Sequence, residues 1–178
     1  MDGRMHNNNQ RQRREPQDGI EEKVLLIRRL SKKTKGGNYI SFSALVVVGD
    51  NISKVGVGLG RGLEVPQAIK KAILHARKHM ITIPVYEETL PHDIKVKFKA
   101  SNIILKPAPK GAGLKVGSVV RSILSLGGVK NASGKILGSR NQVSNVYAVM
   151  KALESLKTRQ SLQMVIRQIL FMMDWINS

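Results

Sequence analysis

The chain contains no cysteine among its 178 residues. It can therefore form no disulfide, hold no metal through thiolate ligands and use no cysteine nucleophile. An absence of cysteine is common in proteins of reducing compartments. The sequence thus excludes the disulfide-stabilised and thiolate-dependent classes, and it is consistent with a protein that works inside the cell.

Aromatic residues are also scarce, at 4% of the chain, although 42% of the residues are hydrophobic. Aliphatic side chains must therefore build the core. Proteins that bind single-stranded nucleic acid without sequence preference stack the bases on exposed aromatic rings. The few aromatic residues here are scattered along the sequence, so we do not expect this kind of binding.

Acidic residues are few relative to basic ones. The chain has 30 Lys and Arg against 12 Asp and Glu, which gives a net charge of +18. Self-repulsion at this charge disfavours the compact state unless a polyanion neutralises it. A sequence pI near 10.6 is typical of proteins that bind nucleic acid. The charge therefore predicts a nucleic-acid partner.

No hydrophobic run is long enough for a membrane span. The most apolar stretch, residues 162–176, is too short to cross a bilayer as a helix. Residues 1–17 are polar and have no apolar segment of the kind found in signal peptides. We expect no membrane contact and a cytoplasmic location. An organelle is less favoured, because the arginine-bearing start has little serine and no apolar face.

Hydrophobic periodicity and turn residues predict an α+β fold of two small domains. Residues 1–19 are expected to form a disordered basic extension, and residues 20–83 a β-β-β-α domain. Its expected parts are a strand at 23–30, a basic loop at 31–37, strands at 39–48 and 55–59, and a helix at 65–80.

The second half is expected to be a βαβα domain at residues 94–157, after a linker at 84–93 and before an apolar, helical tail at 158–178. Its expected parts are a strand at 94–105, a basic loop at 107–113, a helix at 116–126, a short strand at 136–137 and a helix at 141–156. No acidic residue occurs between residues 94 and 153.

One predicted strand alternates apolar residues with Gly56, Gly58 and Gly60. Glycine weakens a strand, so a strand without side chains on one face requires the close approach of another backbone. The approaching backbone can be RNA or a helix of the same domain, and the pattern alone does not distinguish them.

The sequence offers nothing for catalysis. No dinucleotide-binding or phosphate-loop glycine motif is present, and the acid-free half has no carboxylate to act as a base. His75 and His79 have the spacing of two metal ligands on one helix. However, their neighbours Lys70, Lys71, Arg77 and Lys78 would repel a cation. We therefore expect no enzyme activity, no catalytic residue, no metal, no cofactor and no small-molecule substrate.

Two basic loops are the better candidates for a binding site, because ammonium groups and exposed backbone N–H groups can converge on phosphates. The alternative is that these lysines are merely solvated. The predicted RNA-binding residues are Lys32, Lys33, Lys35, Gly36, Gly37, Gly56, Gly58, Arg61, Lys70, Lys71, Lys106, Lys110, Lys115 and Arg140.

A series of short motifs resembles one known family. In the first half these are Ser31-Lys32, Lys35-Gly36-Gly37, Ser41 to Leu45, Val48-Gly49-Asp50, Gly60-Arg61, Glu64-Val65-Pro66 and Ala68 to Ala72. In the second half they are Pro107-Ala108, Gly111, Gly113, Gly117, Val120-Arg121, Gly138-Ser139, Asn141 and Asn145. Over residues 21–156 the chain resembles the bacterial-type family of the fifth protein of the small ribosomal subunit.

The resemblance implies a first domain similar to double-stranded RNA-binding domains and a second, left-handed βαβ-type domain. It implies a structural role in the small ribosomal subunit, near the decoding region and the messenger entry path, with a contribution to assembly and translational accuracy. The implied partners are small-subunit ribosomal RNA and ribosomal proteins four and eight. The 31–37 loop would lie on ribosomal RNA near the spectinomycin site, and Arg121 would contact protein four. A free-standing double-stranded RNA-binding module is the main alternative.

Overall fold

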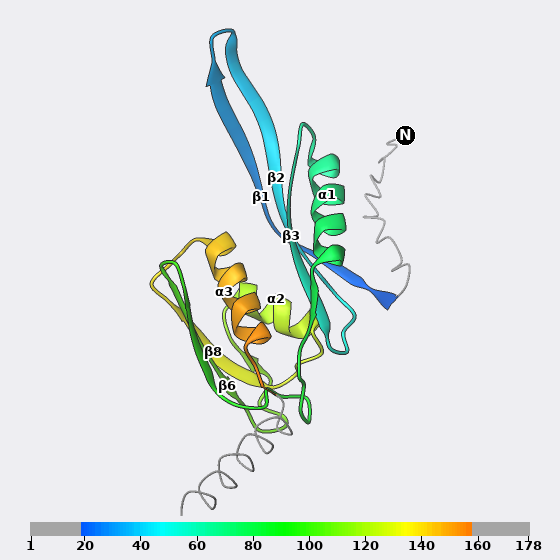
Figure 1. The fold of residues 1–178 in the computed structure, drawn as a ribbon, viewed down its shortest axis with the longest axis vertical. Helices are drawn as coiled ribbons and strands as arrows, with labels where there is room; N and C mark the ends of the chain where they lie inside the picture. The colour runs from blue at the N-terminus through cyan, green and yellow to red at the C-terminus, as the bar shows by residue number, and fades with distance from the viewer. Residues whose placement is uncertain (1–18, 158–178) are drawn as a thin grey trace, which may run out of the picture.

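The structure is a computed structural model that describes residues 19–157, and it is an α+β protein with two sheets (Figure 1). The first part comprises β1 (Glu21–Thr34), β2 (Gly37–Gly49), β3 (Lys54–Gly62), α1 (Val65–Lys78) and β4 (Met80–Thr82). The second comprises β5 (Ile94–Phe98), β6 (Ser101–Pro107), β7 (Leu114–Lys115), α2 (Ser118–Leu126), β8 (Ala132–Leu137) and α3 (Gln142–Glu154). The predicted basic extension (but for Gly19) and the predicted apolar tail lie outside the described residues.

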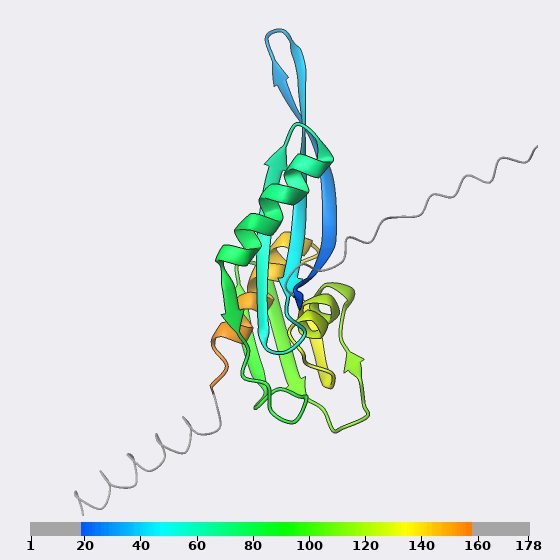
Figure 2. The same ribbon diagram turned by 90° about the vertical axis from the view of Figure 1, so that its right-hand side faces the viewer.

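The first sheet has the order β1-β2-β3-β4 and is antiparallel throughout. Strands β1 and β2 pair from Glu21 opposite Gly49 to Thr34 opposite Gly37, which leaves only Lys35 and Gly36 as the turn. The predicted loop at 31–37 is therefore wrong, because most of its residues continue the two strands. The resulting hairpin projects well beyond the rest of the protein (Figure 2).

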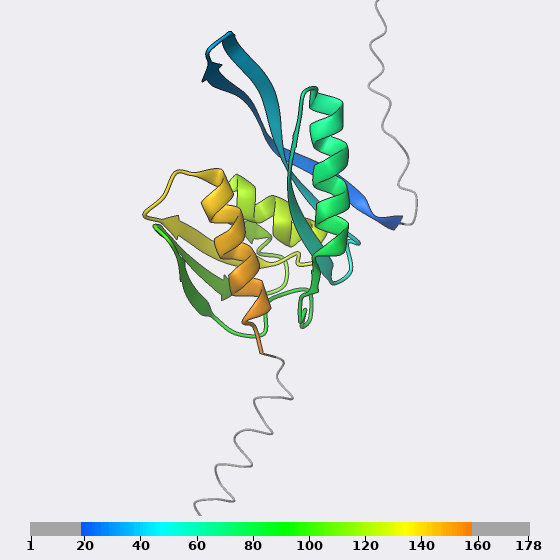
Figure 3. The same ribbon diagram turned by 45° about the horizontal axis from the view of Figure 1, so that its top comes forward.

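Strand β2 is buried on both faces over its second half. Ala44, Val46 and Val48 pack against the buried alanines of α1. Leu45 and Val47 point to the opposite side and join the core of the second half. An uninterrupted apolar run is typical of a strand covered on both faces. The first sheet therefore lies between α1 and the helices α2 and α3, and the second sheet forms the outermost layer (Figure 3).

The glycines of β3 lie directly beneath α1. A side chain at Gly56, Gly58 or Gly60 would collide with the α1 backbone at Ala76, Ala72 or Ala68 respectively. The approaching backbone is thus a helix of the same domain. The prediction that Gly56 and Gly58 bind RNA is wrong, because both residues are buried by this helix.

The first domain has one more strand than the predicted β-β-β-α order, because β4 follows α1 and pairs with β3 from Gly56 to Lys54. The short run 80–82 lacks the periodicity by which a strand is recognised in a sequence. Strand β3 pairs with β2 along one edge, and residues 80–82 pair with its other edge.

The second sheet has the order β5-β6-β8-β7 and places α2 and α3 on its inner face. The single strand predicted at 94–105 is wrong. The chain reverses at Lys99, whose φ is 53°, and β5 pairs antiparallel with β6. Asn141 caps the last helix, because its side chain accepts a hydrogen bond from the Val143 N–H at 3.2 Å.

The two halves are joined by more than the connecting segment. The turn after β2 docks on the end of α2, where the Asn51 N–H donates to the Leu126 carbonyl at 2.9 Å. In the connection 84–93, Leu90 is buried and the Glu88 carbonyl accepts from the N–H groups of Lys130 and Asn131. One continuous core therefore runs from β2 to α3. Within the described residues, no helix has the length and apolar character needed to cross a membrane.

Replacing Gly58 by alanine should destabilise the fold strongly. The new methyl group would overlap the Ala72 carbonyl of α1, and backbone cannot move aside as a flexible side chain can. Overpacking of this kind costs about 1–3 kcal/mol or more in the free energy of unfolding, which urea denaturation measures. The control is Gly36→Ala, where the added methyl group meets open space. An equal effect of the two substitutions would contradict this packing.

Asp50 should contribute to stability in a pH-dependent way. Its carboxylate accepts hydrogen bonds from the N–H groups of Ile52, Ser53 and Lys54 at 2.8–2.9 Å. Burial raises the pKa of Asp50, but these backbone hydrogen bonds outweigh it and lower the pKa below the ordinary value of 3.8. The contribution is therefore fully present above that value and is lost as pH falls through the lower, folded pKa.

We expect Asp50→Ala to reduce the free energy of unfolding by about 1–2 kcal/mol at neutral pH, as loss of a comparable cap does. Denaturant titrations of both proteins should converge as pH falls below about 4, where the wild-type carboxylate becomes protonated. A difference that stays constant down to acid pH would show that the charge is not what holds the turn.

Candidate nucleic-acid interface

The end of the β1–β2 hairpin gathers five of the predicted RNA-binding residues. All of residues 31–40 are exposed. Lys32 lies opposite Tyr39 and Lys33 lies opposite Asn38, so these two lysines occupy opposite faces of the hairpin. Lys35 and Gly36 form the turn, and Gly37 has a φ of 123° that L side chains rarely adopt. The hairpin thus presents cations on both faces and at its tip.

None of these hairpin lysines has an acidic partner among residues 19–157. Within the described residues, the ion pairs are those of Arg77 with Glu22, Lys110 with Glu87 and Lys130 with Glu88. The part of the chain that the structure describes therefore leaves the hairpin charges without a neutralising partner. An arm with cations on several sides suits insertion between nucleic-acid segments, where each face meets phosphates.

Two arginines extend this basic surface toward the body of the protein. Arg28 and Arg61 both pair with Ser43, from the strands on its two sides. Residues that pair across a sheet share a face, so both guanidinium groups lie on the face opposite α1, as does Lys32. Arg61 is among the residues predicted from the sequence, and Arg28 is not. The sequence signal for Arg28 is its spacing, because Arg28, Leu30 and Lys32 lie two residues apart and therefore share one face of β1.

Lys70 and Lys71 are exposed on α1, away from the buried alanines that contact the sheet. The sheet therefore separates them from Arg28 and Arg61. The structure does not bring these helix lysines onto one face with Arg28 of β1 and Arg61 of β3.

In the second half, Lys106 and Lys115 both pair with Ser133 and so share one face of the second sheet. Lys110 lies apart from them in the following loop and forms an exposed ion pair with Glu87 at 3.7 Å. Arg140 is exposed just before α3. The predicted residues of this half thus form no single loop site. Lys106 and Lys115 instead belong to a sheet surface.

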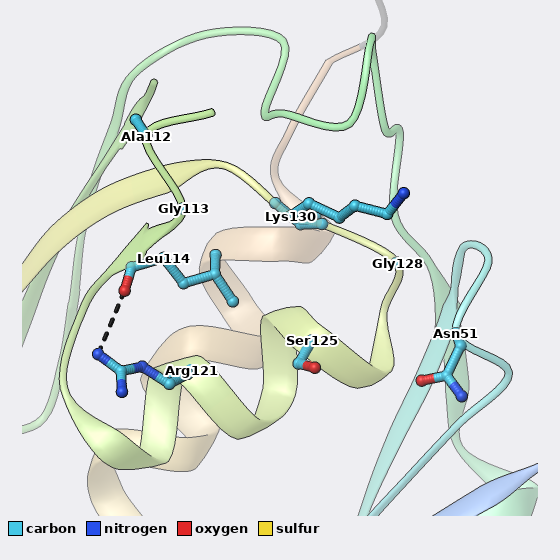
Figure 4. Close-up of a pocket in the computed structure, with 9 residues that line it drawn as sticks. Asn51, Ala112, Gly113, Leu114, Arg121, Ser125, Gly128 and Lys130 are labelled. Carbon is cyan, nitrogen blue, oxygen red and sulfur yellow. Dashed lines mark hydrogen bonds between the residues drawn. The ribbon is translucent and has the colours of Figure 1, made fainter. Parts of the chain in front are cut away.

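Arg121 lies at the rim of an open pocket of about 650 Å³ between the two halves (Figure 4). Its guanidinium donates to the Leu114 carbonyl at 3.2 Å, which orients the side chain along the pocket wall. Asn51, from the first half, and Lys130 also line the pocket. A hydrogen bond from Lys130, reinforced by its charge, lowers the pKa of Glu88. Because Lys130 is paired with Glu88, Arg121 is the lining cation that remains available to an anionic group.

His75 and His79 stack on α1, with ring centroids 4.4 Å apart and an angle of 25° between the rings. The carbonyl of His75 also lies 2.9 Å from Nδ1 of His79. Among residues 19–157, no group of three or more potential ligands gathers around a metal position. The structure thus adds no further ligand to this pair.

Comparisons with known proteins agree with the motifs. The family described as "Ribosomal protein S5, N-terminal domain" matches residues 20–84, and "Ribosomal protein S5, C-terminal domain" matches residues 96–166. The "Small ribosomal subunit protein uS5" of Thermus thermophilus is 46% identical over 148 residues, which cover 83% of this chain and 91% of the relative.

Two further relatives carry the same name. That of Coxiella burnetii is 44% identical over 144 residues, covering 81% of this chain and 86% of its own. That of Mycoplasmopsis agalactiae is 46% identical over 149 residues, covering 83% of this chain and 64% of its own. The matches span both sheets, and the family consists of structural, non-enzymatic ribosomal proteins. The chain therefore belongs to the ribosomal protein S5 family, the uS5 proteins of the small ribosomal subunit.

Proposed function

We propose that this protein holds folded ribosomal RNA in the small ribosomal subunit, near the decoding region and the messenger entry path. It acts as a structural constituent that contributes to assembly and translational accuracy. The observation that carries this proposal is the projecting hairpin, which presents Lys32, Lys33 and Lys35 without acidic partners among the described residues. The net charge of +18 and the shared family support it.

The hairpin recognises RNA through its backbone and shape. Lysine ammonium groups are flexible point charges that suit phosphates, and the arm has little with which to read base edges. Arg28 and Arg61 lie on the same face, and each guanidinium group can donate two hydrogen bonds to one phosphate. Binding through several phosphates releases counterions, so affinity falls steeply as salt rises.

The protein partners are ribosomal proteins four and eight, as the family resemblance implies. Arg121 is the residue we assign to the contact with protein four. Its exposed position beside a pocket between the two halves supports the contact, because no acidic residue lines this pocket and a partner carboxylate could pair with the Arg121 guanidinium there. The protein works in the cytoplasm as part of the ribosome.

The chain should sediment with the small ribosomal subunit when a native lysate is washed in high salt and fractionated on a sucrose gradient. Retention in that peak supports a core component, because loosely bound basic proteins are released by salt. Recovery at the top of the gradient would instead indicate an RNA-binding module that acts outside the ribosome.

Lys33→Glu should weaken small-subunit assembly or alter sensitivity to spectinomycin. The substitution replaces an exposed cation near the hairpin tip by an anion that repels phosphate. Lys151→Glu on α3 is the matched control, because it makes the same charge change away from the hairpin. Gradient profiles and growth on the antibiotic measure the effect. Normal assembly and unchanged sensitivity in the Lys33→Glu strain would contradict the placement of the hairpin.

A further inference from the structure

Tyr39 is the most exposed aromatic residue in the described part of the chain. Its side chain is 53% exposed, and it belongs to neither of the two core clusters. It pairs with Lys32 near the end of the β1–β2 hairpin, which projects beyond the rest of the protein (Figure 2). The fold therefore leaves a large, mostly apolar ring in water at this position.

Within residues 19–157, the Tyr39 side chain has no ring, cation–π or hydrogen-bond partner. By contrast, the rings of Phe98 and Tyr147 contact each other, with centroids 6.2 Å apart. Phe42, three residues after Tyr39 on β2, is partly buried against the core under α1. The Tyr39 ring is therefore available to a binding partner.

Cations lie beside the ring on the same face of the hairpin. Tyr39 pairs directly with Lys32, and side chains that pair in this way start about 5 Å apart. Ser43 lies four residues after Tyr39 on β2 and so shares its face. Ser43 in turn pairs with Arg28 on one side and Arg61 on the other. The aromatic ring thus stands at the outer end of a basic surface.

This combination of side chains favours RNA over a protein partner. Tyrosine is common at both kinds of interface, but lysine is depleted at protein interfaces. A ring beside cations matches a nucleotide, because every base has a π face and every phosphate carries a negative charge. Lys32 lies directly across from Tyr39, where a flexible ammonium group can meet the phosphate of the nucleotide whose base covers the ring.

The base that covers the ring must be unpaired. Bases inside a double helix are already stacked on both faces, and the grooves expose only their edges. Aromatic side chains stack on the bases of loops, bulges and ends, where the stack is open. Such stacking tolerates all four bases, because it uses the face of the base. The ring therefore distinguishes unpaired from paired nucleotides and does not read sequence.

We propose that Tyr39 stacks on one unpaired nucleobase, so that the hairpin selects folded RNA that carries a bulged or looped nucleotide. This inference rests on the proposed RNA-binding function and adds a stacking contact to the phosphate contacts. A single ring holds a single base. The contact therefore differs from the rows of rings in proteins that bind single strands.

The test compares the full chain with its variants Tyr39→Phe, Tyr39→Leu, Tyr39→Ala and Lys32→Gln. Phenylalanine keeps the ring, and leucine keeps an apolar side chain without it. The probes are two short, labelled RNA duplexes that differ only by one bulged adenine. Titrations at several salt concentrations give the affinity and its salt dependence. Urea denaturation checks that each variant is folded.

We expect the wild type and Tyr39→Phe to prefer the bulged RNA, and Tyr39→Leu and Tyr39→Ala to lose this preference. The affinity for the bulged RNA should fall about fivefold to a hundredfold, as expected for one base stacked on an aromatic side chain. The slope of log affinity against log salt should not change, because tyrosine is uncharged. Lys32→Gln should instead reduce that slope by about one unit.

Three results would overturn the stacking contact and leave the proposed function standing. The first is an equal loss of affinity for both RNAs in Tyr39→Ala, because the ring would then only support the hairpin. The second is a full preference for the bulged RNA in Tyr39→Leu. The third is a wild type that binds both RNAs equally well. A wild type that binds neither RNA would overturn the proposed function as well.

Photo-cross-linking in isolated small subunits provides a second readout. Subunits that carry Tyr39→p-benzoylphenylalanine should cross-link from this position to an unpaired nucleotide of ribosomal RNA. Cross-links only to paired nucleotides would overturn the proposal. So would cross-links only to protein, because the ring would then be covered by a protein surface.

Discussion

Burial of strand β2 on both faces is the constraint on which the rest of the structure depends. Ala44, Val46 and Val48 close the core under α1, while Leu45 and Val47 enter the core of the second half. A strand in the middle of two cores cannot shift register, because a slip by one residue would exchange its two faces. The two halves are therefore fixed to each other through β2 as well as through residues 84–93.

This arrangement separates the aliphatic core from the charge. The alanines of α1 and the glycines of β3 allow the helix to approach so closely that no room remains for RNA at Gly56 and Gly58. Cations are left on the projecting hairpin, on the outside of α1 and on the outer face of the second sheet. A protein with this distribution can hold structured RNA while its own core remains dry. Its low aromatic content is consistent with binding through phosphates.

Much of the fold could be predicted because its signals are local. Three features each follow from a few neighbouring residues: the helical spacing of the apolar residues in α1, the Asn141 cap of α3, and the glycines that end α2. The reversal at Lys99 could not, because a lysine with positive φ gives no turn signal in the sequence. The basic run 31–37 was interpreted as a loop, although pairing with Gly37 to Ile40 makes most of it strand. Composition indicated contact with a polyanion there, but it could not indicate strand pairing across a turn.

The sequence by itself determined the α+β class, the basic character of the exposed segments and the family, because periodicity, charge and motif order are properties of the chain. Only the tertiary structure decided which backbone covers the β3 glycines and which distant cations share a face. Arg28 and Arg61 meet across Ser43, and Lys95 and Lys135 across Ile104, through register alone. Register depends on pairing between residues far apart in the chain, and local propensity carries no record of it.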